Sequence, residues 1–370
     1  MQESNNTVSM QQDQQIGNNT TPTEPKKKSK TFTIIAIVLA SIALIAGLGV
    51  GAYFWGKKNN QDNAESNTSD TDESTRDVSQ DLSEDMVYKE ETASQPKWIS
   101  NTPEGDTGPW NSGLYIATSE DGLTFTDEKL FLEHSGVANL IEISDGTLIA
   151  TFQYFSFINE DMFNIIAYTT SSDSGKTWSS VKPVKVNDLS EGETKNGCDP
   201  TLVELSNGQL RLYFTHHQRG EDYPQLFSAI GDSIDSDFLS EGQQLSTEEI
   251  ILDPAVVYFD DMWHHYTVKH GQEFESDPEA EKISVHSISE DGLAFELVEE
   301  ITTDMQFLGD VIEDDEGLRF YNGTKSAYST DGYNWEIDAG DRVDGADPGV
   351  VKLDDGSYIM IYTAHSENKE

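Results

Sequence analysis

The chain has 370 residues and a formal net charge of −45, from 68 acidic and 23 basic side chains. Most of this excess lies from residue 97 onward, where 54 acidic residues stand against 15 Lys and Arg. Nucleic acid and anionic lipid surfaces are therefore poor partners for this part of the chain. Cys198 is the only cysteine, which excludes a disulfide within the chain and favours a buried thiol.

The first 96 residues divide into three segments. Residues 1–31 are polar and are predicted to be a disordered tail. Residues 32–55 form an uncharged run rich in Ile, Ala, Leu and Val, long enough as a helix to cross a hydrocarbon core of roughly 30 Å. Residues 56–96 are rich in Asn, Ser, Thr, Asp and Glu, a composition that predicts a disordered acidic linker.

We interpret residues 32–55 as a transmembrane signal-anchor. The alternative is a cleaved signal peptide, but the preceding 31 residues are too long for its n-region, and no A-x-A-like cleavage site follows. Four lysines precede the run, at positions 26, 27, 28 and 30. The positive-inside rule then keeps the N-terminus in the cytoplasm and places residues 97–370 outside the cell membrane.

Two short patterns alternate along residues 97–370. The first, SxDGxxF/W and its variants, occurs as SEDGLTF (119–125), SSDSGKTW (171–178), SAIGDSIDSDF (228–238), SEDGLAF (289–295) and STDGYNW (329–335). The second is a strand, a turn and a strand, at residues 137–154, 199–216, 253–270, 309–324 and 347–365. Each second pattern predicts strands one and two of a blade, and each first pattern turns strand three into strand four.

The order of the patterns predicts ring closure. The series begins with a lone first pattern and ends with a lone second one, so strands near residue 112 must complete the last blade. Residues 97–370 are therefore predicted to be an all-β, five-bladed β-propeller, and we expect this ectodomain to be a monomer. The Asp and Gly of the first pattern are assigned to the scaffold, because such turns need a side-chain acceptor and a positive φ.

Carboxylates recur where the innermost strand of each blade begins. Asp199, Asp253 and Asp347 each precede a proline at this position, and Asp310 falls two residues further along the fourth blade. Because side chains two residues apart share one face of a strand, all four carboxylates are expected to ring one mouth of the central channel. An alternative interpretation is that each Asp-Pro pair only caps a turn.

Strand two runs back toward the same mouth, so its end is also expected to reach the funnel. Aligning the hairpins on their tyrosines yields Tyr154, His216, Lys269 and His365 as substrate-binding candidates.

Four like charges in a narrow funnel repel one another unless a shared proton, a cation or a bound polyol compensates them. Such a cluster raises at least one carboxylate pKa, which is the condition for a general acid beside an ionised base. An inverting glycosidase needs this pair. No cofactor and no metal ligand set are predicted, although a structural divalent cation in the acidic channel is an alternative means of compensation.

The hairpin DPAVVYFDDMWHHYTV and its copies resemble blades of five-bladed propeller glycosidases, the arabinanase and xylosidase group of glycoside hydrolase family 43. SSDSGKTW resembles the Asp-box of sialidases and other BNR-repeat proteins. Together the two resemblances cover about residues 112–365. The glycosidase resemblance implies a glycan ligand, with the base Asp and the pKa-setting Asp among Asp199, Asp253 and Asp347.

The sequence departs from the glycosidase pattern in two ways. Val137 and Ala138 replace Asp-Pro in the first blade, and no Glu stands in the family's general-acid context. A loop glutamate such as Glu193 or Glu273 is the candidate substitute for the general acid. An exo-sialidase needs an arginine triad, and residues 97–370 contain only Arg211, Arg219, Arg319 and Arg342.

Two functions therefore remain open from the sequence. The first is a membrane-anchored, extracytoplasmic glycoside hydrolase that acts on a neutral glycan through two funnel carboxylates. The second is a non-catalytic surface module that binds a glycan or a protein. An exo-sialidase ranks third.

Overall fold

The computed structural model describes residues 108–270 and 283–365. The predicted tail, transmembrane segment and linker lie outside these residues, as does the candidate Glu273. Within the two described ranges, no helix has the length and apolar character needed to cross a membrane.

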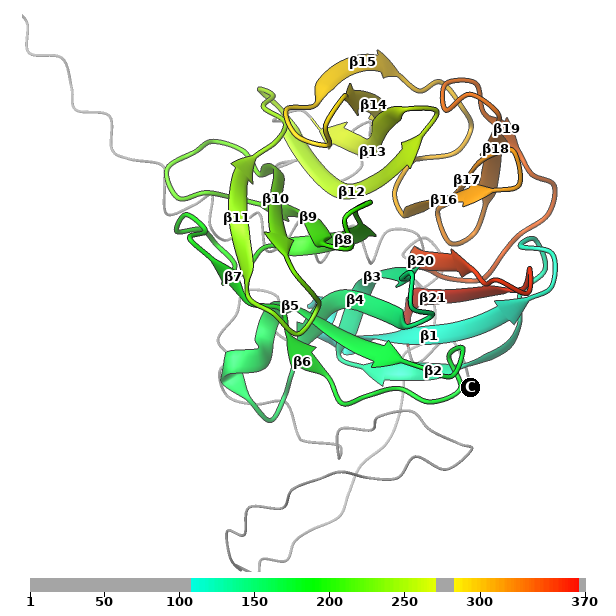
Figure 1. The fold of residues 1–370 in the computed structure, drawn as a ribbon, viewed down its shortest axis with the longest axis horizontal. Helices are drawn as coiled ribbons and strands as arrows, with labels where there is room; N and C mark the ends of the chain where they lie inside the picture. The colour runs from blue at the N-terminus through cyan, green and yellow to red at the C-terminus, as the bar shows by residue number, and fades with distance from the viewer. Residues whose placement is uncertain (1–107, 271–282, 366–370) are drawn as a thin grey trace, which may run out of the picture.

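Five sheets are arranged around one axis, which confirms the prediction of an all-β, five-bladed propeller (Figure 1). Blade 1 contains β3 (Ser135–Glu142), β4 (Leu148–Phe155), β5 (Phe163–Ser171) and β6 (Lys182–Pro183), and blade 2 contains β8 (Cys198–Glu204), β9 (Leu210–His216), β10 (Gln225–Gly231) and β11 (Phe238–Gln243), with β7 (Val186–Asn187) at its edge. Blade 3 contains β12 (Ile250–Phe259), β13 (Met262–His270), β14 (Ile283–Ser289) and β15 (Glu296–Glu300), and blade 4 contains β16 (Asp310–Asp314), β17 (Gly317–Tyr321), β18 (Ser326–Ser329) and β19 (Glu336–Ile337). Blade 5 contains β20 (Ala346–Lys352), β21 (Tyr358–His365), β1 (Ser112–Ser119) and β2 (Thr126–Glu133).

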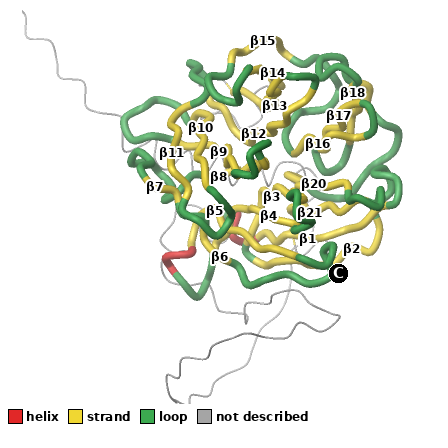
Figure 2. The backbone as a smooth tube through the Cα atoms, in the orientation of Figure 1, coloured by secondary structure: helices red, strands yellow, loops and turns green. Residues whose placement is uncertain are grey.

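The ring closes within blade 5, as the order of the sequence patterns predicts. β1 pairs with β21 along its whole length, and β2 then forms the outer edge of the same sheet. The first two described strands therefore complete a blade whose other two strands are the last. In the described residues, two short 3-10 helices occur, η3 (Pro109–Asn111) and η4 (Glu160–Met162), and the remaining segments are loops and turns that join the strands (Figure 2).

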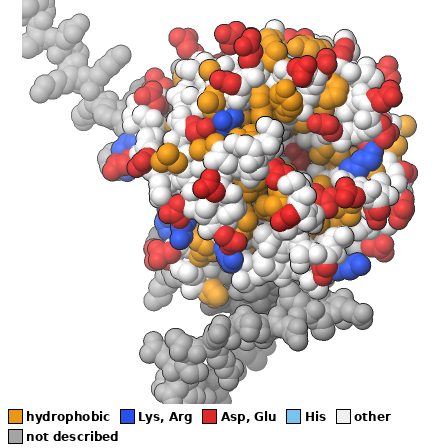
Figure 3. All heavy atoms as spheres, in the orientation of Figure 1, with side chains coloured by type: hydrophobic (Ala, Val, Ile, Leu, Met, Phe, Trp, Pro, Cys, Tyr) orange, Lys and Arg blue, Asp and Glu red, His pale blue; other side chains and the backbone are white. Residues whose placement is uncertain are grey.

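The hydrophobic core is divided among the five blade interfaces. Each interface holds its own cluster of buried apolar side chains, contributed by the facing sheets of two neighbouring blades. Because the sheets pack face to face around the axis, both faces of a strand are covered, and β4 and β9 are buried along their entire length. Acidic side chains are spread over the visible surface, where Lys and Arg are few (Figure 3).

The SxDGxxF/W turns are structural, as expected. In the turn between β18 and β19, the Asp331 carboxylate accepts the Tyr333 and Asn334 amides, each at 2.8 Å, and the Ser329 hydroxyl at 3.0 Å. The three turns that keep Asp-Gly hold their glycine at a φ of 68° to 76°. These hydrogen bonds lower the pKa of Asp331 to about 2, against the opposing effect of its partial burial.

Three of these turns also receive a tyrosine from the preceding blade. Tyr213, Tyr266 and Tyr321 in strand two donate to the turn carbonyls of Gly292, Gly332 and Gly122, at 2.7, 2.8 and 3.1 Å. A Cβ atom on any of these glycines would lie within 3 Å of the tyrosine hydroxyl. Glycine is thus required at this position for two reasons: the backbone has a positive φ, and the neighbouring blade approaches too closely for a Cβ atom.

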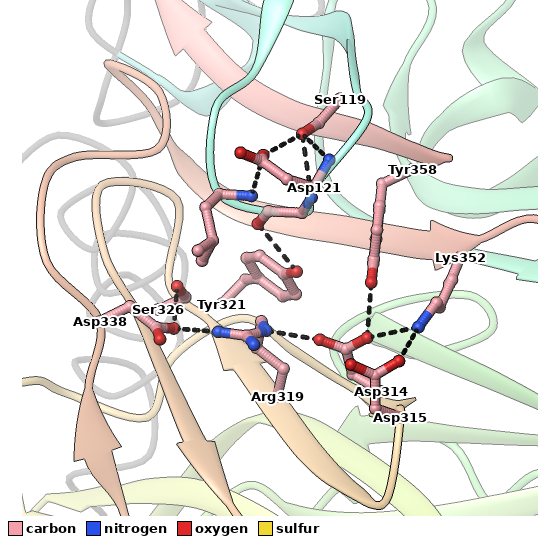
Figure 4. A network of polar contacts seen from close by, with 12 residues as sticks. Ser119, Asp121, Asp314, Asp315, Arg319, Tyr321, Ser326, Asp338, Lys352 and Tyr358 are labelled. Carbon is pink, nitrogen blue, oxygen red and sulfur yellow. Dashed lines mark hydrogen bonds and ion pairs between the residues drawn. The ribbon is translucent and has the colours of Figure 1, made fainter. Parts of the chain in front are cut away.

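A buried ionic cluster joins blades 4 and 5 beside one of these tyrosines (Figure 4). Asp314, which is 2% exposed, accepts Arg319 Nε at 2.6 Å, Lys352 Nζ at 2.8 Å and the Tyr358 hydroxyl at 2.5 Å. Although burial raises the pKa of Asp314, these donors outweigh it and lower the pKa. Lys352 and Tyr358 belong to blade 5, so the cluster fixes one blade against the next.

We expect Tyr321→Phe to lower the free energy of unfolding by about 1 kcal/mol, because the Gly122 carbonyl loses its buried donor. Chemical denaturation of the variant measures this loss. Tyr333→Phe is the matched control, since Tyr333 is 42% exposed and should change stability by less than about 0.5 kcal/mol. Equal losses in both variants would contradict the role of the tyrosine contact.

Candidate functional site

The innermost strands of four blades share an unusual backbone conformation near their starts. Val137, Asp199, Asp253 and Asp347 all adopt left-handed backbone, with φ between 46° and 51°. Each lies at a register shift against strand two. Asp tolerates this conformation far better than a β-branched residue, so the repeated Asp has a conformational reason as well as a chemical one.

The four predicted carboxylates line one cavity on the propeller axis. Its volume is about 10 Å³, which is close to the space that one water needs. Its lining comprises Val137, Ala138, Asn139, Asp199, Pro200, Thr201, Asp253, Pro254, Gly309, Asp310 and Asp347. The structure thus brings Asp199, Asp253, Asp310 and Asp347 together from blades 2, 3, 4 and 5.

Burial makes these carboxylates unusual. The four aspartates are between 3% and 6% exposed. Desolvation raises the pKa of Asp199, against the smaller lowering effects of the Thr215 hydroxyl, the Cys198 thiol and the Asp253 amide. Burial likewise raises the pKa of Asp310 to about 7, although it accepts three hydrogen bonds. The Asp310 carboxyl is therefore about half protonated near neutral pH.

Asp310 belongs to a hydrogen-bonded latch that crosses the axis. Its Oδ2 accepts the Val350 amide of blade 5 at 3.0 Å, and its Oδ1 accepts the Asn139 side-chain amide of blade 1 at 3.3 Å. The Asn139 Oδ1 in turn accepts the Leu202 amide of blade 2 at 2.9 Å. We call this set of contacts the axial latch.

Blade 3 is joined to blade 2 by a similar contact, because the Thr201 hydroxyl donates to the Pro254 carbonyl. Together with the axial latch, this contact links the inner strands of all five blades. The sequence offers a weak signal for the latch: Asn139 is the one polar residue in the run 137–141.

Tyr154 and Lys269, at the ends of strand two in blades 1 and 3, do not line this cavity. Tyr154 is buried in the apolar cluster between blades 5 and 1, and Lys269 forms ion pairs of 3.1 Å with Glu249 and Glu300, toward the outer strand of blade 3. The physical reason is that strand-two side chains leave through the two faces of the sheet, toward a neighbouring blade or the outer strands, rather than toward the channel.

His216, the third candidate from strand two, does not line the axial cavity either. His216 is buried beside Phe227 and donates from Nε2 to the Ser190 carbonyl at 3.1 Å. By register with β20, the position that matches His216 in blade 5 is Ala364. The side chain of His365 lies outside the described residues.

Glu193, the substitute general acid considered from the sequence, lies next to the cavity wall. Its carboxylate forms an ion pair with His217, with Oε1 and Nδ1 3.1 Å apart, and it acts electrostatically on the Cys198 thiol. Burial lowers the pKa of His217, but the Glu193 carboxylate outweighs it, so that the pKa is raised. Glu193 is thus engaged by His217 and does not line the axial cavity.

The arginines give no carboxylate-binding triad. Arg211 pairs with Glu241, Arg219 with Glu191 and Arg319 with Asp314 and Asp338, while Arg342 donates to backbone carbonyls. None of the four lines the axial cavity. Among the residues that the structure describes, no group of three or more His, Cys, Asp or Glu is placed to hold a metal ion.

No protein-family model matches the chain, and no curated protein does. Solved structures with a similar fold include a thermostable family-43 glycoside hydrolase, with 10% identity and a TM-score of 0.44 over 62% of this chain and 88% of that one. An endo-arabinase from Bacteroides thetaiotaomicron has 15% identity and a TM-score of 0.46, over 62% and 89%. A family 117 glycoside hydrolase from the marine bacterium Zobellia galactanivorans has 14% and 0.41, over 70% and 91%. At these values the likeness concerns the fold and carries no argument about activity.

We expect Asn139→Ala to lower the free energy of unfolding by about 1 to 3 kcal/mol, because the Leu202 amide and Asp310 both lose a buried partner. Urea denaturation measures the change. Asn207→Ala, in the exposed turn between β8 and β9, is the control and should stay within about 0.5 kcal/mol. A loss at Asn139 no larger than the control would rule out a stabilising latch.

The raised pKa of Asp310 predicts a pH dependence. Its carboxyl binds a proton in the folded state up to about pH 7, whereas in the unfolded chain it ionises near its usual value of 3.8. The stability that this proton contributes is complete below about pH 4 and is lost as the pH rises through about 7. Asp310→Asn cannot titrate, so the stability of wild type relative to this variant should fall across that window. A difference that is flat with pH would show that Asp310 is ionised throughout.

Proposed function

We propose that residues 97–370 form a glycoside hydrolase that acts on a neutral glycan through paired carboxylates at the channel mouth. The observation that carries this proposal is the convergence of Asp199, Asp253 and Asp347 on one cavity that has no Lys or Arg in its lining. A carboxylate cluster with no Lys or Arg in the cavity lining suits a ligand that donates hydrogen bonds and carries no negative charge.

The proposed roles follow from burial and contacts. Asp199 supplies the proton to the glycosidic oxygen, because burial raises its pKa. Asp253 or Asp347 acts as the base that activates a water, and the cavity of about 10 Å³ is large enough for that water. Asp310 holds the backbone amides of Val311 and Val350, so we assign it to the scaffold.

A specific observation supports a second candidate, a non-catalytic surface module that binds a glycan or a protein. Val137 adopts the same left-handed backbone as Asp199, Asp253 and Asp347, so the position itself does not require a carboxylate. The repeated Asp then serves the backbone alone, as Asn or Asp commonly does at positive φ.

The location of the activity is also a proposal. The apolar run at residues 32–55 and the lysines before it support a single-pass anchor with a cytoplasmic N-terminus. The propeller is then a monomeric domain held outside the cell by the acidic linker, in reach of surface or environmental glycans.

We expect the full-length protein to hydrolyse at least one member of a panel of neutral arabinans, xylans and galactans, with inversion at the anomeric carbon. Asp199→Asn should lower kcat at least 100-fold, because general acid catalysis typically contributes factors of 10² to 10⁴. Its melting temperature should be equal or higher, because the buried carboxyl no longer ionises.

Asp173→Asn is the matched control. Asp173 accepts the Thr177 amide and the Ser171 hydroxyl, both at 2.8 Å, in the turn between β5 and β6. This variant should keep its kcat and lose roughly 0.5 to 2 kcal/mol of stability. Similar stability losses at Asp199 and Asp173, with no turnover by wild type, would sink the hydrolase proposal and leave the binding module.

A further inference from the structure

A second cavity lies at the same end of blade 2 as the channel mouth. It has a volume of about 220 Å³ and is bounded by the β9–β10 connection and the β11–β12 connection. The register places it there: Cys198 beside the mouth pairs with Thr215, and the next residue, His216, pairs with Gln225 on β10. The cavity therefore lies one to two strands outward from Asp199.

The inner wall of this cavity is buried and ordered by its own contacts. His216, Gln225 and Phe227 are each no more than 5% exposed. Gln225 donates to the Glu249 carbonyl and accepts the Thr247 amide, each at 2.8 Å, and so fixes the β11–β12 connection against β10. The wall is thus built by side chains whose geometry does not depend on a ligand.

The His216 ring lines this wall, and its Nδ1 is buried. Its Nε2 donates to the Ser190 carbonyl, which leaves Nδ1 as an acceptor in the neutral ring. Within the described part of the chain, this Nδ1 has no hydrogen-bond partner. Burial lowers the pKa of His216, so the ring stays a neutral acceptor.

The rim combines acceptors, donors and an aromatic ring. Glu221, Asp222 and Glu248 provide exposed carboxylates, Gln218 provides a side-chain amide, and Tyr223 lies among them. No Lys or Arg lines the cavity, and its three carboxylates repel an anionic ligand. A sugar hydroxyl both donates and accepts, and it matches this mixture better than an ammonium group, which can only donate.

We propose that this cavity binds one neutral sugar unit, as a second subsite on the face of the propeller that carries the carboxylate mouth. The ion pair between Glu193 and His217 lies between the two sites: Glu193 acts on Cys198 at the mouth, and Asp222 at the cavity acts on His217. A glycan chain across this row contacts the mouth and the cavity together. This inference rests on the proposed function for its ligand class, but not for catalysis.

Calorimetric titration of the full-length protein with linear arabino-, xylo- and galacto-hexaose tests the subsite. Ser246→Trp places an indole in the exposed rim of the cavity, and Gln218→Ala removes a rim amide with little risk to folding. Ser206→Trp, exposed in the β8–β9 turn at the opposite end of blade 2, is the matched control. We expect one hexaose to bind, Ser246→Trp to weaken it at least tenfold, Gln218→Ala to weaken it severalfold, and Ser206→Trp to change it less than twofold.

Two results would overturn the subsite. One is that no hexaose binds, or that spermidine alone responds to the cavity variants, which would make the cavity a cation site. The other is that hexaose binding, and KM where there is turnover, are unchanged in both cavity variants. If the cavity variants hydrolyse hexaose normally and with an unchanged KM, the subsite proposal fails and the hydrolase proposal stands. If the cavity variants weaken hexaose binding but the wild type shows no turnover, the hydrolase proposal fails and the subsite proposal stands.

Discussion

The axial latch is the contact on which the geometry of this propeller depends. Asn139 and Asp310 join blades 1 and 4 across the axis, and their remaining oxygens hold backbone amides of blades 2 and 5. An unpaired polar group at this depth would cost more than the net gain of an ordinary hydrogen bond. Together with the contact between Thr201 and Pro254, the latch therefore holds the five inner strands at one spacing, and this spacing decides how closely the carboxylates of neighbouring blades approach.

Two buried aspartates at the mouth, Asp310 and Asp199, have different roles, and only Asp310 belongs to the latch. Both carboxylate oxygens of Asp310 accept hydrogen bonds from amides, so its role is structural. Its raised pKa is a consequence of burial. Asp199 contacts a thiol and lies on a left-handed bulge, with a pKa that burial also raises. The same desolvation thus accompanies a scaffold in one case and a candidate proton donor in the other, and the contacts rather than the pKa distinguish them.

The side chains of strand two contact the scaffold rather than the channel mouth. Its tyrosines donate to turn glycines of the next blade, and Lys269 reaches the outer strand of its own blade. Ligand contacts at this end of the propeller therefore fall to strand starts and to the connections, which do not have to pack against a neighbouring sheet. Blade 2 has both, with Asp199 at the mouth and the larger cavity behind His216.

The sequence by itself determined the repeat, the number of blades, the closure through β1 and the scaffold role of the Ser-x-Asp-Gly turns. Each of these follows from local patterns in which alternation, turn glycine and short-range hydrogen bonds act within a few residues. It also predicted the meeting of Asp199, Asp253, Asp310 and Asp347, because repeated strand starts converge on the axis of a ring. Only the tertiary structure decided that Tyr154, Lys269 and His216 point away from the funnel, that Asn139 bridges to Asp310, and that a cavity opens beside blade 2. These features depend on contacts between blades far apart in the chain, and a strand's own alternation does not reveal which neighbour each face will meet.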